Sequence, residues 1–233
     1  MTQLLISVKN VEEALIALDA GAEIIDLKDP SIGALGALGL ITSEQIVKAI
    51  NKRVILSSTV GEQHKNVSEL AAAICAYEKI GVDIIKIAVN NLFTHLDFES
   101  EINKLIEKKI KLVAVFFAED EINWPQLKQI SKLGFYGAMI DTKQKKKDIT
   151  QIVSLIDLQN FTQTCIFHHL KSGLAGSLKL QHINHLTHLN PSYMGFRGGV
   201  CKDFERQSIL IAQNISEIKK MLLKHNNFEL IAQ

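Results

Sequence analysis

The stretch EIIDLKDP, residues 23–30, carries the charged pair around which the fold of this chain is organised. Read as a β-strand, it places Ile24, Asp26 and Lys28 on one face and the alternating residues on the other. The flanking AGA and SIGALGALG segments are typical of α/β connections, so both faces are expected to be covered. A carboxylate and an ammonium on a covered face are unfavourable unless they pair. Two interpretations follow: Lys28 is a reactive group tuned by Asp26, or the pair only fixes packing.

Length and composition favour a globular protein with a sizeable core. The chain has 233 residues, which is typical of a (β/α) barrel folded as one domain. Its hydrophobic fraction of 47% and charged fraction of 22% are ordinary for such proteins. A net charge of +1 provides no bulk attraction to nucleic acid or membrane, so we expect neither as a partner.

Cysteine usage and the first residues indicate the compartment. Cys75, Cys165 and Cys201 are widely spaced and form neither a metal-binding pattern nor a disulfide framework, so we expect reduced thiols. The opening MTQLLISVKN lacks the pattern of a signal peptide. No apolar run approaches the roughly 18 residues of a membrane span. We therefore expect a cytoplasmic protein.

Short apolar segments alternate with amphipathic helical segments along the whole chain. Their short spacing suits right-handed crossovers in a parallel sheet, and eight such units in 233 residues indicate a closed barrel. We predict an α/β fold, a single (β/α)8 TIM barrel forming one domain over residues 1–233. A doubly wound sheet is the main alternative. The strands are expected at 4–7, 23–28, 53–59, 83–89, 111–117, 136–141, 170–175 and 192–197.

The predicted helices carry recognisable start signals. Asn10 and Ser43 are the expected N-caps of the first two helices. The final helix is expected at 205–224, followed by a short segment at 226–233.

Polar residues gather at the carboxyl ends of the predicted strands, where barrel enzymes place their active sites. Two lysines, two aspartates and an arginine at one end of a barrel predict such a site. The candidates are Asp26 and Lys28 of the second strand, Ser57 and Thr59 of the third, Lys86 of the fourth, Asp141 of the sixth and Arg197 of the eighth.

Small residues follow the seventh and eighth strands, where barrels usually bind phosphate. Gly176-Ser177 and Gly198-Gly199 are suited to present backbone N–H groups and a helix N-terminus to an anion. Arg197 adds a charge, and Thr59 is a further candidate for substrate or phosphate binding.

A lysine on a barrel wall has two common uses. It forms a Schiff base with a carbonyl substrate when burial or a second cation favours its neutral amine, or it holds phosphate by charge alone. Lys86 is a candidate for the second cation. Asp26 and Asp141 are then candidates for moving protons.

Seven motifs occur in a fixed order: LLISVKNVEEA, GAEIIDLKDPSIGALGA, SSTVGE, IIKIAV, AMIDT, GLAGS and GFRGGVCK. Together they resemble the (5-formylfuran-3-yl)methyl phosphate synthase family of methanofuran biosynthesis. The resemblance covers nearly the whole chain, and DLKDPSIGALGA is its most specific motif.

The resemblance implies a TIM-barrel lyase with lysine chemistry like that of class I aldolases. Such an enzyme condenses two molecules of glyceraldehyde 3-phosphate to a phosphorylated furan aldehyde, with loss of phosphate and water and without a metal or organic cofactor. The family's Schiff-base lysine corresponds to Lys28, with its aspartate partner at Asp26. Lys86, Asp141 and Lys145 complete the expected catalytic set.

Alternatives to this function remain open at this stage. One alternative is another Schiff-base phosphosugar aldolase. The other is a non-catalytic protein that binds a phosphorylated metabolite. The sequence also leaves open a homo-oligomer and the question of which lysine of loop 143–147 reaches the site.

Three further signals are set aside. His182, His185 and His188 have no accompanying carboxylate and drift around their helix, so no metal site is expected. Cys201 has no histidine placed to activate it. The lysines at 143–147 lack the interleaved aromatics of a nucleic-acid surface.

Overall fold

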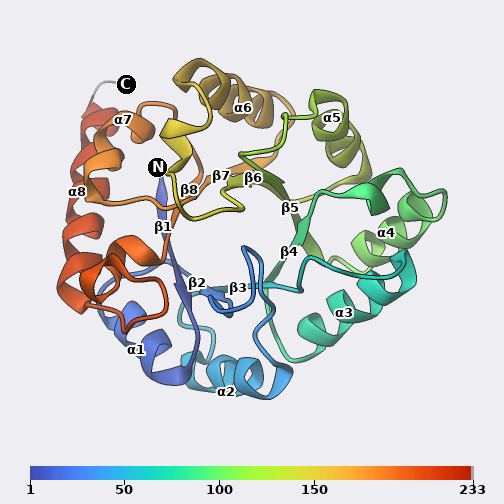
Figure 1. Cartoon of the computed structure of the whole chain (residues 1–233), viewed down its shortest axis with the longest axis horizontal. Coiled ribbons are helices and arrows are strands. Elements are labelled where there is room, and N and C mark those ends of the chain that lie inside the picture. Colours follow the sequence, from blue (N-terminus) through green and yellow to red (C-terminus); the bar gives the residue numbers. More distant parts are fainter. Residues whose placement is uncertain (232–233) are drawn as a thin grey trace.

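The computed structural model describes residues 1–231 and forms a closed barrel of parallel strands inside a ring of helices (Figure 1). The strands follow chain order around the barrel, and β1 pairs with β8 to close it. The prediction of a TIM barrel is confirmed. The strands are β1 Gln3–Val8, β2 Ile24–Leu27, β3 Ile55–Thr59, β4 Ile84–Ala88, β5 Lys111–Phe117, β6 Gly137–Asp141, β7 Lys171–Leu174 and β8 Tyr193–Phe196.

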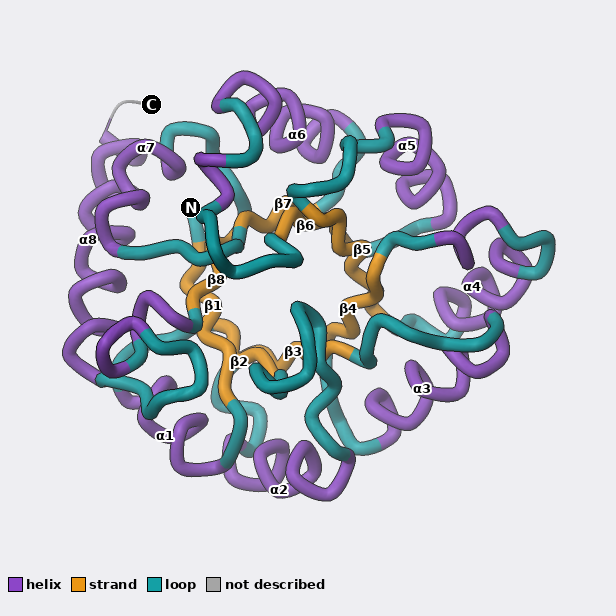
Figure 2. The backbone as a smooth tube through the Cα atoms, in the orientation of Figure 1, coloured by secondary structure: helices purple, strands orange, loops and turns teal. Residues whose placement is uncertain are grey.

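The helices lie outside the strands, as the purple and orange tubes of Figure 2 show. Side chains of Asn10, Asn66, Asn123 and Ser154 cap four of them by accepting backbone N–H groups of the first turn. The α-helices are α1 Val11–Asp19, α2 Leu40–Ile50, α3 Val67–Lys79, α4 Phe98–Glu107, α5 Trp124–Leu133, α6 Leu155–Phe167, α7 Ile183–Thr187 and α8 Ala212–Ile231. No helix within residues 1–231 has both the length and the apolar character needed to cross a bilayer.

Strand alternation separates two apolar layers. Residues such as Ile25 and Ile87 face outward and join the main core beneath the helices. Leu5, Ile24 and Tyr193 belong to a second cluster inside the barrel. Polar residues predicted for the site, such as Asp26 and Lys86, lie two positions after these inward apolar residues, towards the carboxyl ends of the strands. The barrel therefore has an apolar floor and a charged carboxyl end.

The predicted start of the second helix is wrong. The helix α2 begins at Leu40 after Gly39, and no side chain caps it. Ser43 lies buried inside its first turn and donates its hydroxyl to the carbonyl of Leu38 at 3.1 Å. A serine in the first turn of a helix satisfies a nearby carbonyl as readily as it caps an N-terminus.

The last helix also differs from the prediction. It begins at Ala212, not at residue 205, because Lys202–Phe204 form a tight 3-10 turn in which Asp203 and Phe204 take left-handed φ angles of 54° and 58°. It then continues through the segment predicted to follow it, up to Ile231; residues 232–233 lie outside the described part of the chain. The irregular loop this leaves before α8 reaches the functional pocket.

Candidate active site

A pocket of about 590 Å³ opens at the carboxyl ends of the strands. Its volume is typical of sites for small molecules. Eight basic and four acidic side chains line it, although the whole chain carries a net charge of only +1. The charged residues are Lys28, Lys86, Lys145, Lys146, Lys147, Lys179, Arg197 and Arg206, with Asp26, Asp141, Asp148 and Glu205. Such a concentration of cations favours an anionic ligand.

The deepest charges form an ion pair between β2 and β4. The Nζ atom of Lys86 lies 2.6 Å from Oδ1 of Asp26, and both side chains are almost fully buried. Asp26 also accepts the hydroxyls of Ser7 at 2.9 Å and Ser57 at 2.8 Å. A carboxylate with three donors is well compensated for the loss of water.

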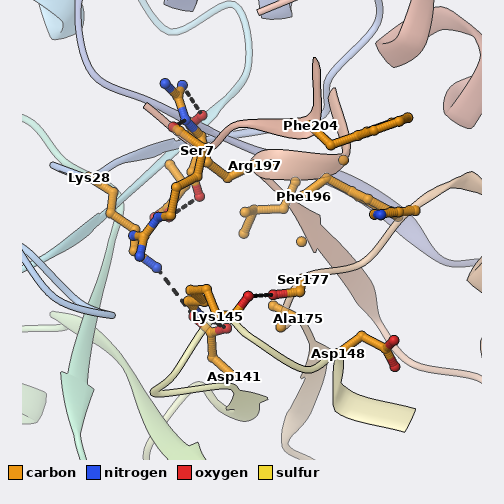
Figure 3. Close-up of a pocket in the computed structure, with 18 of the residues that line it drawn as sticks. Ser7, Lys28, Asp141, Lys145, Asp148, Ala175, Ser177, Phe196, Arg197 and Phe204 are labelled. Atoms are coloured by element: carbon orange, nitrogen blue, oxygen red, sulfur yellow. Dashed lines mark hydrogen bonds and ion pairs between the residues drawn. The ribbon is translucent and has the colours of Figure 1, made fainter. Parts of the chain in front are cut away.

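A second group of charges lies around Asp141 at the end of β6. Lys28 donates to its Oδ2 atom at 3.2 Å, and Lys145 donates to its Oδ1 atom at 2.6 Å. The backbone N–H of Thr142 adds a third donor at 2.8 Å. In Figure 3, Lys28 faces Asp141 and Lys145 across the pocket, and Ser177 lies beside Lys145.

The expected pairing of Asp26 with Lys28 is therefore corrected. The two residues share a strand face as predicted, but Asp26 forms its ion pair with Lys86 and Lys28 forms its ion pair with Asp141. The register of the barrel is the physical reason. Asp26 pairs with Ser57 on β3, and the next residue of that inward row, Thr59, pairs with Lys86 on β4. A long side chain on β4 can then reach back to β2.

The cluster holds three amines and only two carboxylates, which affects protonation. Burial lowers the pKa of Lys86; Asp26 opposes this shift and repulsion from Lys28 adds to it. Burial likewise lowers the pKa of Lys145 to about 8, against the attraction of Asp141. Burial alone would raise the pKa of Asp141, but Lys145 and Lys28 outweigh it and hold the pKa below its usual range. The charges balance when one amine is neutral.

The loops after β7 and β8 form one concave backbone surface at the side of the pocket. The N–H groups of Gly176, Ser177, Gly198 and Gly199 donate to no acceptor within residues 1–231, while all four residues line the pocket. Gly176 and Ser177 have φ angles of 112° and 51°, which turn the chain sharply. Consecutive free amides of this kind bind anions. We call these four residues the cradle.

The glycines of the cradle are required by close approach. A Cβ atom on Gly199 would collide with the carbonyl oxygen of Leu178, so the two loops touch backbone to backbone. A Cβ atom on Gly176 would lie 2.7 Å from the side chain of Thr142. The expected helix N-terminus is weaker than predicted, because a short 3-10 turn, Leu180–His182, precedes a five-residue α7.

The predicted role of Arg197 is corrected. Its guanidinium forms a two-pronged ion pair with Glu13 of α1, and its remaining N–H groups donate to the carbonyls of Ser7, Arg206 and Ser208. All five donors are thus engaged by protein. Arg197 holds the loop after β8 in place and offers no free donor to a phosphate.

The family whose sequence model matches the chain is described as 4-HFC-P synthase, and the match covers residues 4–219. The chain belongs to the 4-HFC-P synthase family. A relative from Methylorubrum extorquens is 39% identical over 216 residues, covering 92% of this chain and 89% of the relative. The (5-formylfuran-3-yl)methyl phosphate synthase of Methanococcus aeolicus is 30% identical, with 92% and 96% covered.

Solved structures support the fold of this member of the 4-HFC-P synthase family. A 3-hexulose-6-phosphate synthase superimposes with a TM-score of 0.69 at 14% identity, covering 94% of this chain and 99% of that structure. Phosphoribosyl anthranilate isomerase from Thermus thermophilus gives 0.68 at 12% identity, with 96% and 99% covered. At these identities the likeness concerns the barrel alone.

Thr59 lies outside the pocket of this family member, contrary to expectation. Its side chain is fully buried, and its hydroxyl donates to the carbonyl of Gly36 at 2.9 Å. It thereby holds the glycine-rich loop after β2 against β3. A threonine that ends a barrel strand is as well suited to fix a neighbouring loop as to bind a ligand.

Sequence reasoning missed Arg206. This residue lines the pocket from the irregular loop before α8, where a helix was predicted. The RQS segment has no glycine pattern and no strand end to mark it, so only the path of the loop reveals its position.

Within the described residues, no group of three or more histidine, cysteine, aspartate or glutamate side chains is arranged to hold a metal ion. The donor set of the pocket, rich in ammonium groups and backbone N–H, suits anions instead.

Proposed function

We propose that the chain is a (5-formylfuran-3-yl)methyl phosphate synthase. It condenses two molecules of glyceraldehyde 3-phosphate through a Schiff base on Lys28, as a carbon–oxygen lyase of methanofuran biosynthesis. The observation that carries the proposal is the amine of Lys28 within a buried cluster of three lysines and two aspartates, beside the cradle. Family membership and the names of the relatives support the same activity.

Lys28 is the best placed of the three amines to react. Lys86 lies deeper and is tied to Asp26 at 2.6 Å. Lys145 is tied to Asp141 at 2.6 Å and also donates to the backbone carbonyl of Thr142. Lys28 has one longer contact, 3.2 Å to Asp141, and so leaves its partner most readily. A buried amine next to other cations is the arrangement that favours Schiff-base formation.

The reaction begins when the nitrogen lone pair of Lys28 adds to the aldehyde carbon of one triose phosphate and water leaves. The resulting iminium acidifies the C–H group next to it. Loss of that proton gives an enamine. The enamine carbon attacks the aldehyde of the second triose phosphate and forms the new carbon–carbon bond. Eliminations and ring closure follow, and hydrolysis frees Lys28. One phosphate and two waters leave in total, so the balance needs no oxidant or reductant.

Proton transfers fall to Asp141 and Lys145. Asp141 accepts hydrogen bonds from the amines of both Lys28 and Lys145, so a proton taken from carbon or delivered to a leaving oxygen has a short path. Lys145 has a pKa of about 8 and exchanges protons near neutrality. Lys86 stays paired with Asp26 at the deep end of the same cluster. Gly176, Ser177, Gly198 and Gly199 hold a phosphoryl group.

The test is incubation of the purified protein with glyceraldehyde 3-phosphate. We expect an ultraviolet-absorbing furan aldehyde and one inorganic phosphate for each pair of triose phosphates consumed. Lys28→Met should abolish both signals, whereas the matched control Lys48→Met, on the exposed face of α2, should leave them unchanged.

Two other outcomes would contradict the proposal. A simple aldol product without the chromophore would identify another Schiff-base phosphosugar aldolase. Binding without turnover of any triose phosphate would identify a non-catalytic barrel.

A further inference from the structure

Arg206 spans the mouth of the pocket between two loops. Its backbone lies beside the cradle: a Cβ atom on Gly198 would be 3.8 Å from the Cβ atom of Arg206. Its guanidinium ends on the other side, where an N–H donates to the carbonyl of Gly33 at 3.0 Å. Gly33 belongs to the loop that directly follows Lys28. The charge therefore lies on the β2 side of the pocket, away from the amides of Gly176 and Ser177 on the β7 side.

The donors of Arg206 are largely free. A guanidinium has five N–H groups, and the bond to Gly33 is the single one that Arg206 makes with an acceptor in residues 1–231. No carboxylate in that range lies within ion-pair distance of it; Arg197, in contrast, pairs with Glu13. The chain thus has one arginine that builds the loop and one that presents unpaired donors to the pocket.

The position of Arg206 is fixed by its neighbour in the loop. Arg197 donates Nε–H to the backbone carbonyl of Arg206 at 2.7 Å and a second N–H to the carbonyl of Ser208 at 3.1 Å. The buried pair with Glu13 holds Arg197 itself. A preorganised arginine with free donors suits two-pronged binding of a phosphoryl group.

Electrostatics add to this geometry. Burial lowers the pKa of Lys145, and repulsion from Lys28 and Arg206 adds to the shift. The three cations therefore share one space that a bound dianion would neutralise. The cradle accounts for one phosphoryl group, and the proposed reaction brings two.

We propose that Arg206 anchors the phosphoryl group of the second triose phosphate while the cradle holds that of the triose bound to Lys28. This inference rests on the proposed function. The pocket then holds both substrates at once, with their phosphates at opposite sides and the reacting carbons near Lys28. Arg206 is a substrate-binding residue for the condensation and is not needed for the iminium.

Two readouts on Arg206→Gln separate these steps. Borohydride trapping of glyceraldehyde 3-phosphate on Lys28 reports the first triose, and we expect its half-saturating concentration to stay within twofold of wild type. Formation of the furan product needs both trioses, and we expect its half-saturating concentration to rise at least tenfold. Arg206→Lys should fall between, because an ammonium keeps the charge and loses the two-pronged geometry. Lys202→Gln, an exposed neighbour outside the pocket, is the matched control and should change neither readout.

A titration with inorganic phosphate gives a readout independent of turnover. We expect two bound phosphates per wild-type chain and one in Arg206→Gln. If Arg206→Gln does not fold, both tests are made on Arg206→Lys. We then expect weaker binding of the second phosphate and unchanged binding of the first.

Equal loss of trapping and product formation in the folded variant, or no loss of either, would overturn the assignment of Arg206 alone. A wild-type protein that forms neither adduct nor product would overturn the proposed function together with it.

Discussion

The crossed pairing of the buried charges can be tested by mutating Asp26 and its two candidate partners. The Lys86–Asp26 pair is 2.6 Å long, with side-chain exposures of 4% and 1%. Removing one partner of such a pair costs about 3–5 kcal/mol of the free energy of unfolding. Because Ser7 and Ser57 still donate to Asp26, we expect Lys86→Met to fall at the lower end of that range.

The asymmetry between the partners refines the prediction. In Asp26→Asn, Lys86 is left without its carboxylate, but its lowered pKa lets it shed the proton, so the loss should be smaller than for Lys86→Met. The double variant should lose less than the two single variants combined, with a coupling of about 2 kcal/mol. The cycle between Asp26 and Lys28 should show less than about 1 kcal/mol, since they form no ion pair.

The assay is urea unfolding at pH 7. Trp124 is the only tryptophan of the chain, so its fluorescence reports α5, and circular dichroism reports all helices. Coincident transitions justify the two-state free energies. A Lys28–Asp26 coupling as large as that of Lys86–Asp26 would refute the crossed arrangement and restore the pairing expected from sequence.

Three further predictions concern the proton donor, the cradle and the loop brace. Below pH 8 Lys145 is protonated and can donate a proton, so kcat/KM should fall as the pH rises through about 8. Lys145→Met should lose this fall at high pH. An unchanged pH profile in that variant would exclude Lys145 as the proton donor. Gly199→Ala should raise KM for triose phosphate at least tenfold, because its methyl group would collide with the backbone carbonyl of Leu178. The control Gly39→Ala, which has open space around its methyl group, should leave KM unchanged. Equal effects of the two variants would contradict phosphate binding by the cradle. Glu13→Gln leaves Arg197 buried without its carboxylate and should lower the free energy of unfolding by about 3 kcal/mol in urea; a change below about 0.5 kcal/mol would mean that the pair does not brace the loop.

Much of the fold followed from local patterns. Strand alternation correctly placed Asp26 and Lys28 on one inward face, and the eight repeats correctly predicted closure of the barrel. Helix boundaries were accurate where a strong signal exists, as for Asn10, which caps the start of α1. They failed at residue 205, where the left-handed Phe204 interrupts the chain without a glycine to announce it.

Pairings between distant side chains could not be predicted in the same way. Which lysine meets Asp26 depends on the register of β2, β3 and β4, and no local pattern encodes that register. The arginine at the end of β8 looked like a phosphate ligand because Glu13, its partner, lies 184 residues earlier in the first turn of α1. The arginine with free donors, Arg206, lies in an irregular loop whose path only the folded chain reveals.

The most direct test of Schiff-base chemistry on Lys28 is the site of covalent attachment. The protein is incubated with glyceraldehyde 3-phosphate, reduced with borohydride, digested and analysed by mass spectrometry. We expect a triose phosphate adduct on the peptide that contains Lys28 and none on the peptides that contain Lys86 or Lys145. An adduct on either of those lysines, or turnover without any adduct, would contradict this expectation.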